Sequence, residues 1–307
     1  MKLFSRSSKI EPSGSYWLLY ALPALLVYVI FLVYPLLDSM RLSTYTGGFS
    51  NMTFVGLSNF KKLFSDPEIS TRYFNALKNT SIFFAIHMLV QNVLGIIFAV
   101  LLSQKGRDRR NNIFQVIIFI PATLAILVTG YLWKLLLNPI WSKGLLDAIG
   151  LSTLAQPWLG KQSTALIAIS LVSSWQWVGI PMMMFVAALR NIDEHLFEAS
   201  TIEGANGWQV FRFIQLPLIM PVVGIVAILT FVNNFNAFDV VFAMETANGA
   251  PEYATDILGT LFYRTGIAGQ HPIGIPDPGL GAAIATITFI ILLIGVIPVL
   301  LKTRTKE

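Results

Sequence analysis

Two polar stretches lie inside long apolar runs of this sequence. The first contains Trp175 and Trp177, and the second carries three amides within four positions, at Asn233, Asn234 and Asn236. Amides supply both hydrogen-bond donors and acceptors, and aromatic rings supply flat apolar faces, a mixture that suits a polar solute with some C–H surface. Asn and Gln also hydrogen-bond neighbouring helices to one another in membranes. Both a solute path and helix–helix contacts therefore remain open for these residues.

Motifs for catalysis and phosphate binding are missing from the sequence. Gly160-Lys161-Gln162-Ser163 resembles a fragment of a phosphate-binding loop, but Ala155 replaces the first glycine and Gln162 the hydroxyl residue. The chain has no His-Glu-x-x-His or Gly-x-Ser-x-Gly motif, no cluster of metal ligands and no cysteine. We therefore expect that the chain is not an enzyme, that it has no catalytic or metal-binding residues, and that it holds no cofactor of its own.

The composition places the chain in a membrane. Hydrophobic residues make up 55% of the 307 positions and charged residues 12%, about half the charged fraction of a soluble domain. The basic residues flank apolar runs and are not interleaved with aromatic residues, so the net charge of +5 predicts contact with lipid and no nucleic-acid partner. Six runs are long enough to span a bilayer as helices, and we expect an all-α fold from them: 16–37, 80–102, 113–137, 164–189, 216–242 and 280–301.

The distribution of Lys and Arg predicts the orientation of these spans. Basic residues cluster before the first span, in the short loop after the second, and after the last: Lys2, Arg6, Lys9, Lys105, Arg107, Arg109, Arg110, Lys302, Arg304 and Lys306. Such segments face the cytoplasm. We therefore expect a cytoplasmic N-terminus (1–15), a six-helix transmembrane domain (16–301) and a cytoplasmic C-terminus (302–307). The loop at about 190–215 also faces the cytoplasm in this topology.

The loop at 190–215 is acidic although it lies on the cytoplasmic side, so another reason is needed for its charge. Its pattern predicts a short helix over 193–202, a turn at Gly204, and a second segment with Trp208, Phe211 and Ile214 on one side. We expect Pro217 to set the entry to the next span. The predicted product is a helix-turn-helix with apolar side chains and an acidic edge, which is suited to docking.

This loop resembles the Glu-Ala-Ala loop of the permease subunits of bacterial binding-protein-dependent ABC importers. The matching residues are Glu198-Ala199-Ser200, Gly204-Ala205 and Ile214-Gln215-Leu216-Pro217. Ser200 replaces the third-position Ala of the family pattern, and Glu203 stands where Asp is usual. The resemblance implies a type I importer permease fold in which the loop forms the coupling helix that docks on an ATP-binding subunit. The implied coupling residues are Glu198, Ala199, Ser200, Glu203, Gly204, Ala205 and Pro217.

Other segments are similar to the sugar-type branch of the family, in the style of maltose and glycerol-phosphate permeases: Phe54–Phe60, Phe64–Pro67, Asn138-Pro139, Gly144–Leu146 and Pro157–Leu159. The resemblance implies a bacterial inner-membrane protein that moves a sugar or sugar-like solute. The implied partners are a second permease, two ATP-binding subunits that bind ATP and Mg, and an extracytoplasmic solute-binding protein. The implied solute path comprises Trp175, Trp177, Val178, Gly179, Met182, Asn233, Asn234 and Asn236.

An ion-coupled secondary transporter of a small polar solute is the alternative. Such proteins contain an inverted repeat and acidic residues inside the membrane, and here the nearest acid is Asp239, close to the end of a span. The second span adds His87, Gln91 and Asn92. A lone neutral histidine is more often a packing or interhelical group than a ligand-binding one, so His87 predicts little by itself.

Overall fold

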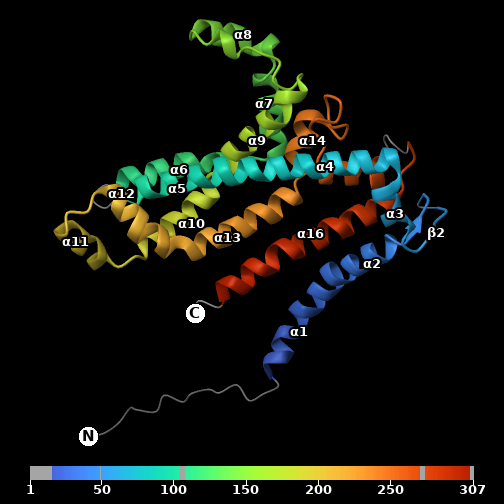
Figure 1. Cartoon of the computed structure of the whole chain (residues 1–307), viewed down its shortest axis with the longest axis horizontal. Coiled ribbons are helices and arrows are strands. Elements are labelled where there is room, and N and C mark those ends of the chain that lie inside the picture. Colours follow the sequence, from blue (N-terminus) through green and yellow to red (C-terminus); the bar gives the residue numbers. More distant parts are fainter. Residues whose placement is uncertain (1–15, 49, 104–107, 270–273, 305–307) are drawn as a thin grey trace.

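The computed structural model describes residues 16–48, 50–103, 108–269 and 274–304 (Figure 1). Their architecture is helical, apart from a small antiparallel hairpin that pairs β1 (Tyr45–Thr46) with β2 (Thr53–Phe54). The hairpin links the first long helix to α3 (Ser58–Ser65). The basic residues Lys2, Arg6, Lys9, Lys105, Arg107 and Lys306, on which part of the predicted orientation rests, lie outside the described residues.

Four continuous helical stretches are long and apolar enough to cross a membrane. Each is built from one or more elements. They are α1, η1 and α2 (Tyr16–Tyr28, Val29–Val33, Tyr34–Leu42); α4, η2 and α5 (Pro67–Ile86, His87–Asn92, Val93–Leu102); α12, η4 and α13 (Gly207–Val210, Phe211–Gln215, Leu216–Phe235); and α16 (Pro278–Arg304).

Two further apolar runs are bent. α6 (Asp108–Thr123) and α7 (Ile126–Leu136) meet at 94°, and α9 (Gln162–Trp177) and α10 (Gly179–Arg190) meet at 44°. The first bend follows Pro121, whose ring disfavours a continuous helix. The described residues thus contain six candidate spans only when each bent pair counts as one. The third span expected over 113–137 corresponds to the bent pair α6 and α7.

The fifth span ends earlier than its hydrophobicity predicts. α13 stops at Phe235, and residues 239–245 form a separate short helix, α14 (Asp239–Glu245). The span also begins earlier than expected. Asn206 and Gln209 form a capping box at the start of α12, and the helix continues through a π-helical turn into α13. Pro217 lies in the first turn of α13, as expected, although the helical stretch itself begins further back, at Gly207.

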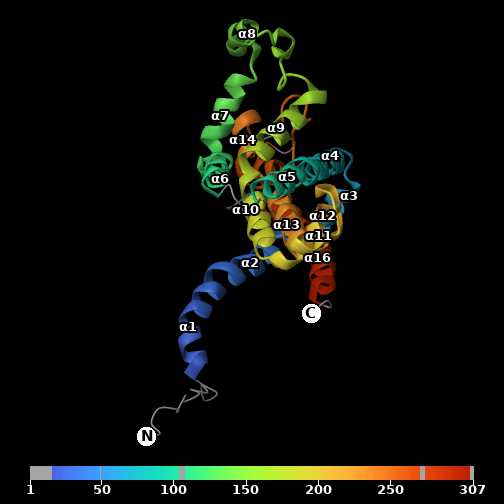
Figure 2. The same ribbon diagram turned by 90° about the vertical axis from the view of Figure 1, so that its left-hand side faces the viewer.

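Within the bundle, α10 packs against α5, α6 and α13. α16 lies against α13 and α2, and α1 stands apart from the bundle (Figures 1 and 2). Gly179 at the start of α10 is a point of close approach, since a Cβ there would lie 2.8 Å from the Cα of Phe119 on α6. The elements α11 (Glu194–Ile202) and α12 occupy one end of the molecule, while α3 and α14 lie at the other (Figure 1).

A buried ion pair fixes the segment between α14 and α15 (Leu258–Tyr263). Both side chains, Asp256 and Arg264, have 0% exposure, and Arg264 Nη1 donates to Asp256 Oδ1 at 3.1 Å. Burial raises the pKa of Asp256, while the bonds from Arg264 act against that shift. Asn79 on α4 donates to the carbonyl of Asp256 at 2.9 Å, and the Arg72 guanidinium stacks 3.2 Å from the ring centroid of Tyr253. The network ties this segment to α4.

Candidate functional site

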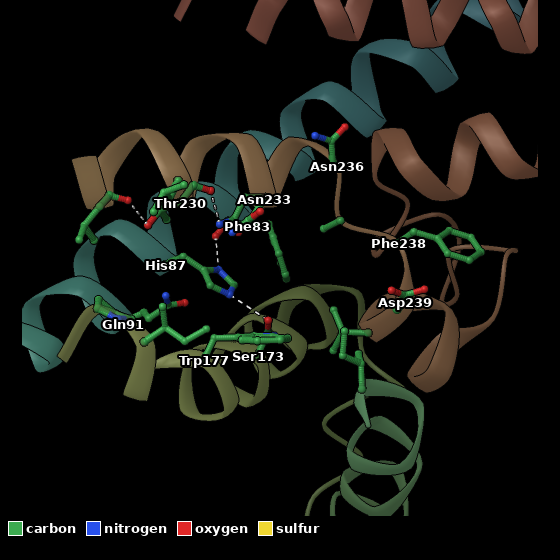
Figure 3. A pocket seen from close by; sticks show the side chains of 18 of the residues that line it. Phe83, His87, Gln91, Ser173, Trp177, Thr230, Asn233, Asn236, Phe238 and Asp239 are labelled. Atoms are coloured by element: carbon green, nitrogen blue, oxygen red, sulfur yellow. Dashed lines mark hydrogen bonds between the residues drawn. The ribbon is translucent and has the colours of Figure 1, made fainter. Parts of the chain in front are cut away.

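A cavity of about 350 Å³ lies between the second, fourth and fifth candidate spans, near the end of α13. This volume is in the range of small-molecule sites. Side chains from α4, η2, α9, α10 and α13 line it, together with Ile126 of α7 and residues 236–240 (Figure 3). Its polar lining residues are His87, Gln91, Ser173, Trp177, Thr230, Asn233, Asn234, Asn236 and Asp239.

His87 connects two walls of the cavity. Its Nδ1 lies 2.8 Å from the carbonyl oxygen of Phe83, and its Nε2 lies 3.0 Å from the hydroxyl oxygen of Ser173 on α9. A carbonyl only accepts, so Nδ1 carries the proton, and in the neutral ring Nε2 accepts from Ser173. Figure 3 shows the His87 ring between η2 and α9. His87 and Ser173 therefore join α4 to α9 at the cavity wall.

Asn234 presents an unsatisfied acceptor at the cavity. The residue is 5% exposed, and its Nδ2 donates to the carbonyl of Thr230 at 2.7 Å. Its buried Oδ1 has no partner among the described residues. Buried polar atoms are almost always hydrogen-bonded in folded proteins. Asn234 lines the cavity, so a small shift of its side chain would let this buried oxygen accept a hydrogen bond from a solute or from water.

The neighbouring polar residues Asn92 and Thr230 already have hydrogen-bond partners. Asn92 Nδ2 donates to Thr230 Oγ1 at 3.0 Å, and Thr230 also donates to the carbonyl of Val226 at 2.8 Å. These bonds join η2 to α13, as expected of polar residues that hold membrane helices together. Asn92 does not line the cavity, whereas its helix neighbours His87 and Gln91 do.

The structure brings half of the predicted path residues to this cavity. Trp177, Asn233, Asn234 and Asn236 line it. Trp175, Val178, Gly179 and Met182 do not.

The residues away from the cavity lie in packing contacts. Met182 is fully buried in the cluster of α5, α10 and α13, and Val178 is 6% exposed. Trp175 meets Trp133 edge to face, with ring centroids 5.4 Å apart. Gly179 packs against α6. A contribution of these four residues to the path stays a prediction.

Ser173 and Thr230 are cavity residues that sequence reasoning missed. Single hydroxyls in apolar helices often bond their own backbone, so they carry a weak signal. One clue was available, because Ser173 and Trp177 are four residues apart and therefore share a helix face. Gln91 and His87 likewise repeat at four residues. The polar residues on α4, η2 and α9 could thus have been paired across two spans.

The acidic loop forms the helix-turn-helix that its sequence predicts. α11 spans Glu194–Ile202, and Asp193 caps it by accepting from the backbone of His195 at 3.0 Å. Gly204 has φ +74°, in the left-handed region that glycine adopts freely. The loop then turns into α12, where the Trp208 and Phe211 rings lie 5.6 Å apart.

Few of the predicted coupling residues make contacts with the rest of the chain. In α11 only Ser200 is buried, and its hydroxyl donates to the carbonyl of Phe197 at 2.8 Å. Ala205 is half-buried, while Glu198, Ala199, Glu203, Gly204 and Pro217 are exposed. The large apolar side chains Ile202 and Trp208 are 87% and 69% exposed. Their coupling role stays a prediction, and the geometry makes them available to another chain.

Titratable groups elsewhere in the described residues do not form a metal-binding cluster. No group of three or more His, Asp or Glu side chains is arranged to hold a metal ion there. Glu245, at the end of α14, has its pKa raised to about 6 by burial, with Lys134 acting in the opposite direction. Glu245 does not line the cavity.

Comparison with known proteins identifies the family. Residues 91–304 match the family described as "Binding-protein-dependent transport system inner membrane component". The chain is 31% identical to the lactose transport system permease LacF of Rhizobium radiobacter, covering 81% of this chain and 82% of that one. It is 29% identical to a probable starch degradation products permease, AmyD, of Thermoanaerobacterium thermosulfurigenes, covering 99% of each chain.

The fold matches that of a solved transporter. A bacterial ABC transporter for the acidic polysaccharide alginate contains a chain with a TM-score of 0.77 and 22% identity, covering 94% of this chain and 96% of that one. Together with the candidate spans, the family match accounts for the apolar composition. The protein is therefore a member of the binding-protein-dependent inner-membrane transport family, a multi-pass membrane permease subunit of an ABC importer.

Proposed function

We propose that this chain and a second permease together form the translocation path for a sugar or sugar-like solute. The observation that carries the proposal is the cavity. It is lined by the indole of Trp177, by the amides of Asn233 and Asn236, and by Asn234, whose buried Oδ1 has no partner. Sugars offer hydroxyl donors and apolar C–H faces, which match these groups. Relatives named for lactose, starch degradation products and arabinooligosaccharides support the same class.

ATP hydrolysis belongs to two partner subunits in this proposal. α11 and the turn at Gly204 dock on one of them, and those subunits bind ATP and Mg. The exposed Ile202 and Trp208 and the acidic edge at Glu198 support a docked partner, because apolar side chains exposed outside the membrane indicate an interaction surface. The sequence lacks a phosphate-binding loop, which agrees with this division.

An extracytoplasmic solute-binding protein delivers the solute at the opposite end, where α14 and α3 lie (Figure 1). The chain sits in a bacterial cytoplasmic membrane with both termini in the cytoplasm. Arg109 and Arg110, at the start of α6, support this orientation. None of the apolar first span is buried against the rest of the chain. This supports its contact with lipid or with the second permease.

Uptake into proteoliposomes tests this proposal. The complete complex is reconstituted with its binding protein, and uptake of labelled lactose and maltotriose is measured with and without ATP inside the vesicles. We expect uptake that requires ATP, the binding protein and all subunits, and we expect this chain purified alone to show no ATPase turnover. Uptake driven by a proton or sodium gradient in the absence of ATP would instead establish the secondary-transporter alternative.

A further inference from the structure

We propose that Asp239 gives the cavity a selectivity for neutral or amino-substituted sugars over anionic ones such as uronic or phosphorylated sugars. The inference rests on the proposed function, since it names the solute class of the same cavity. This selectivity would distinguish the permease from one that transports an acidic polysaccharide. Asp239 begins α14 at the end of the cavity that lies beyond α13 (Figure 3).

Among the described residues that line the cavity, Asp239 is the one acid, and none is Lys or Arg. It makes no ion pair within the described residues. His87 is 3% exposed and has no carboxylate partner, a setting that favours the neutral imidazole. The carboxylate of Asp239 is therefore not balanced by a cation on this wall. Asp239 is itself exposed, at the open edge of the cavity, where the low-dielectric walls focus its field and raise the local concentration of cations over anions.

The remaining polar groups also favour a solute that donates hydrogen bonds. Asn234 Oδ1 is a buried acceptor without a partner, and the carboxylate of Asp239 adds two more acceptor oxygens. A sugar hydroxyl or ammonium can donate to the exposed carboxylate of Asp239 and, once the Asn234 side chain shifts, to its buried Oδ1. A carboxylate or phosphate group can only accept, so beside Asn234 it would leave the oxygen unpaired, and beside Asp239 it would add like-charge repulsion.

Glu245 supplies a matched control on the same helix. It lies six positions after Asp239, carries the same kind of group, and does not line the cavity. Lys134 is close enough to stabilise its charged form. Because burial raises its pKa to about 6, measurements near pH 8 keep this side chain ionised. Glu245→Gln and Asp239→Asn then remove one negative charge each from the same helix.

The field can be measured without any solute, because the chain contains no cysteine. In a complex with cysteine-free partners, Ala237→Cys places one thiol on the cavity wall, and Asn236→Cys provides a second, exposed position on the same segment. The rates of reaction with a cationic and an anionic methanethiosulfonate of similar size are compared. The cationic-to-anionic rate ratio at each position is divided by the same ratio measured for a small free thiol, which removes the intrinsic difference in reactivity between the two reagents.

We expect the cationic reagent to be favoured about tenfold at these positions, and Asp239→Asn to remove most of that preference. Glu245→Gln should leave it unchanged within about twofold. In uptake assays, Asp239→Asn should raise the rate for a galacturonate oligomer relative to the matching neutral oligomer. A normalised ratio near one in the parent, or one unchanged by Asp239→Asn, overturns the inference. Because the labelling needs no transport, that result is independent of whether the complex imports sugars.

Discussion

The loop that carries α11 and the segment that joins α14 to α15 are both connections between spans, but they handle polar residues in opposite ways. The α14–α15 segment buries Asp256 completely and pairs it with the equally buried Arg264, which begins η5 (Arg264–Ala268), and with Asn79 on α4. The α11 loop leaves its acids and its Ile202 exposed. Within this loop, His195 Nδ1 lies 3.2 Å from Glu198 Oε2, and both side chains are well exposed.

This difference indicates where each loop obtains its stability. A buried charge without its partner is strongly destabilising, so the α14–α15 network matters to the fold of this chain itself. Exposed ion pairs contribute little, so the α11 loop gains little from its own contacts. Substitutions should therefore reduce folding in the first region and coupling to another subunit in the second.

The largest effect is expected at Arg264. Arg264→Met leaves Asp256 buried without its cation, which should cost roughly 3–5 kcal/mol of stability. We expect a large loss of monodisperse complex in detergent and a lower unfolding temperature. Arg212→Met is the matched control, because Arg212 is exposed near the α11 loop. Equal yields for the two variants would show that the buried pair is not needed for folding.

A smaller effect on folding, but a clear one on transport, is expected at Gly204. A Cβ there meets no atom within 4 Å, so the cost of Gly204→Val comes from φ +74° alone, about 1–2 kcal/mol. We expect an assembled complex whose ATP-driven uptake falls by at least about fivefold. Gly204→Asn should retain most activity, because Asn tolerates left-handed backbone. Normal uptake in the valine variant would show that this turn is not needed for coupling.

The smallest effect is expected in the cavity, where Asn234 and Thr230 should behave differently. Asn234→Leu removes an acceptor available to the solute, about 1 kcal/mol or fivefold in uptake per assembled complex. Thr230→Val breaks the bond to Asn92 between spans and should lower the yield of complex by more than it lowers uptake per complex. If Asn234→Leu lowers the yield of complex but leaves uptake per assembled complex unchanged, Asn234 is a helix contact and not part of the path.

Sequence reasoning was most accurate in the α11 loop. Its helix limits and its turn depend on local chemistry: Asp193 caps a helix, and Gly204 adopts positive φ. The bend between α6 and α7 and the end of α13 at Phe235 were missed, because hydrophobicity continues across both points. Trp175 and Trp177 show the same limit in the cavity. They are two residues apart in one helix, so they point in different directions, and only packing decides which faces the cavity.

The central claim is that the exposed α11 loop is the docking site of an ATP-binding subunit, and crosslinking tests it directly. Because the chain has no cysteine, Ile202→Cys introduces a single thiol at a position that is 87% exposed on α11. Ile140→Cys is the control on α8 (Pro139–Ala148), 83% exposed and far from α11 in Figure 1. With a short thiol-to-amine crosslinker, we expect Ile202→Cys to join the chain to the co-purified ATPase, and Ile140→Cys not to. A crosslink to the ATPase from Ile140→Cys but not from Ile202→Cys would contradict the account.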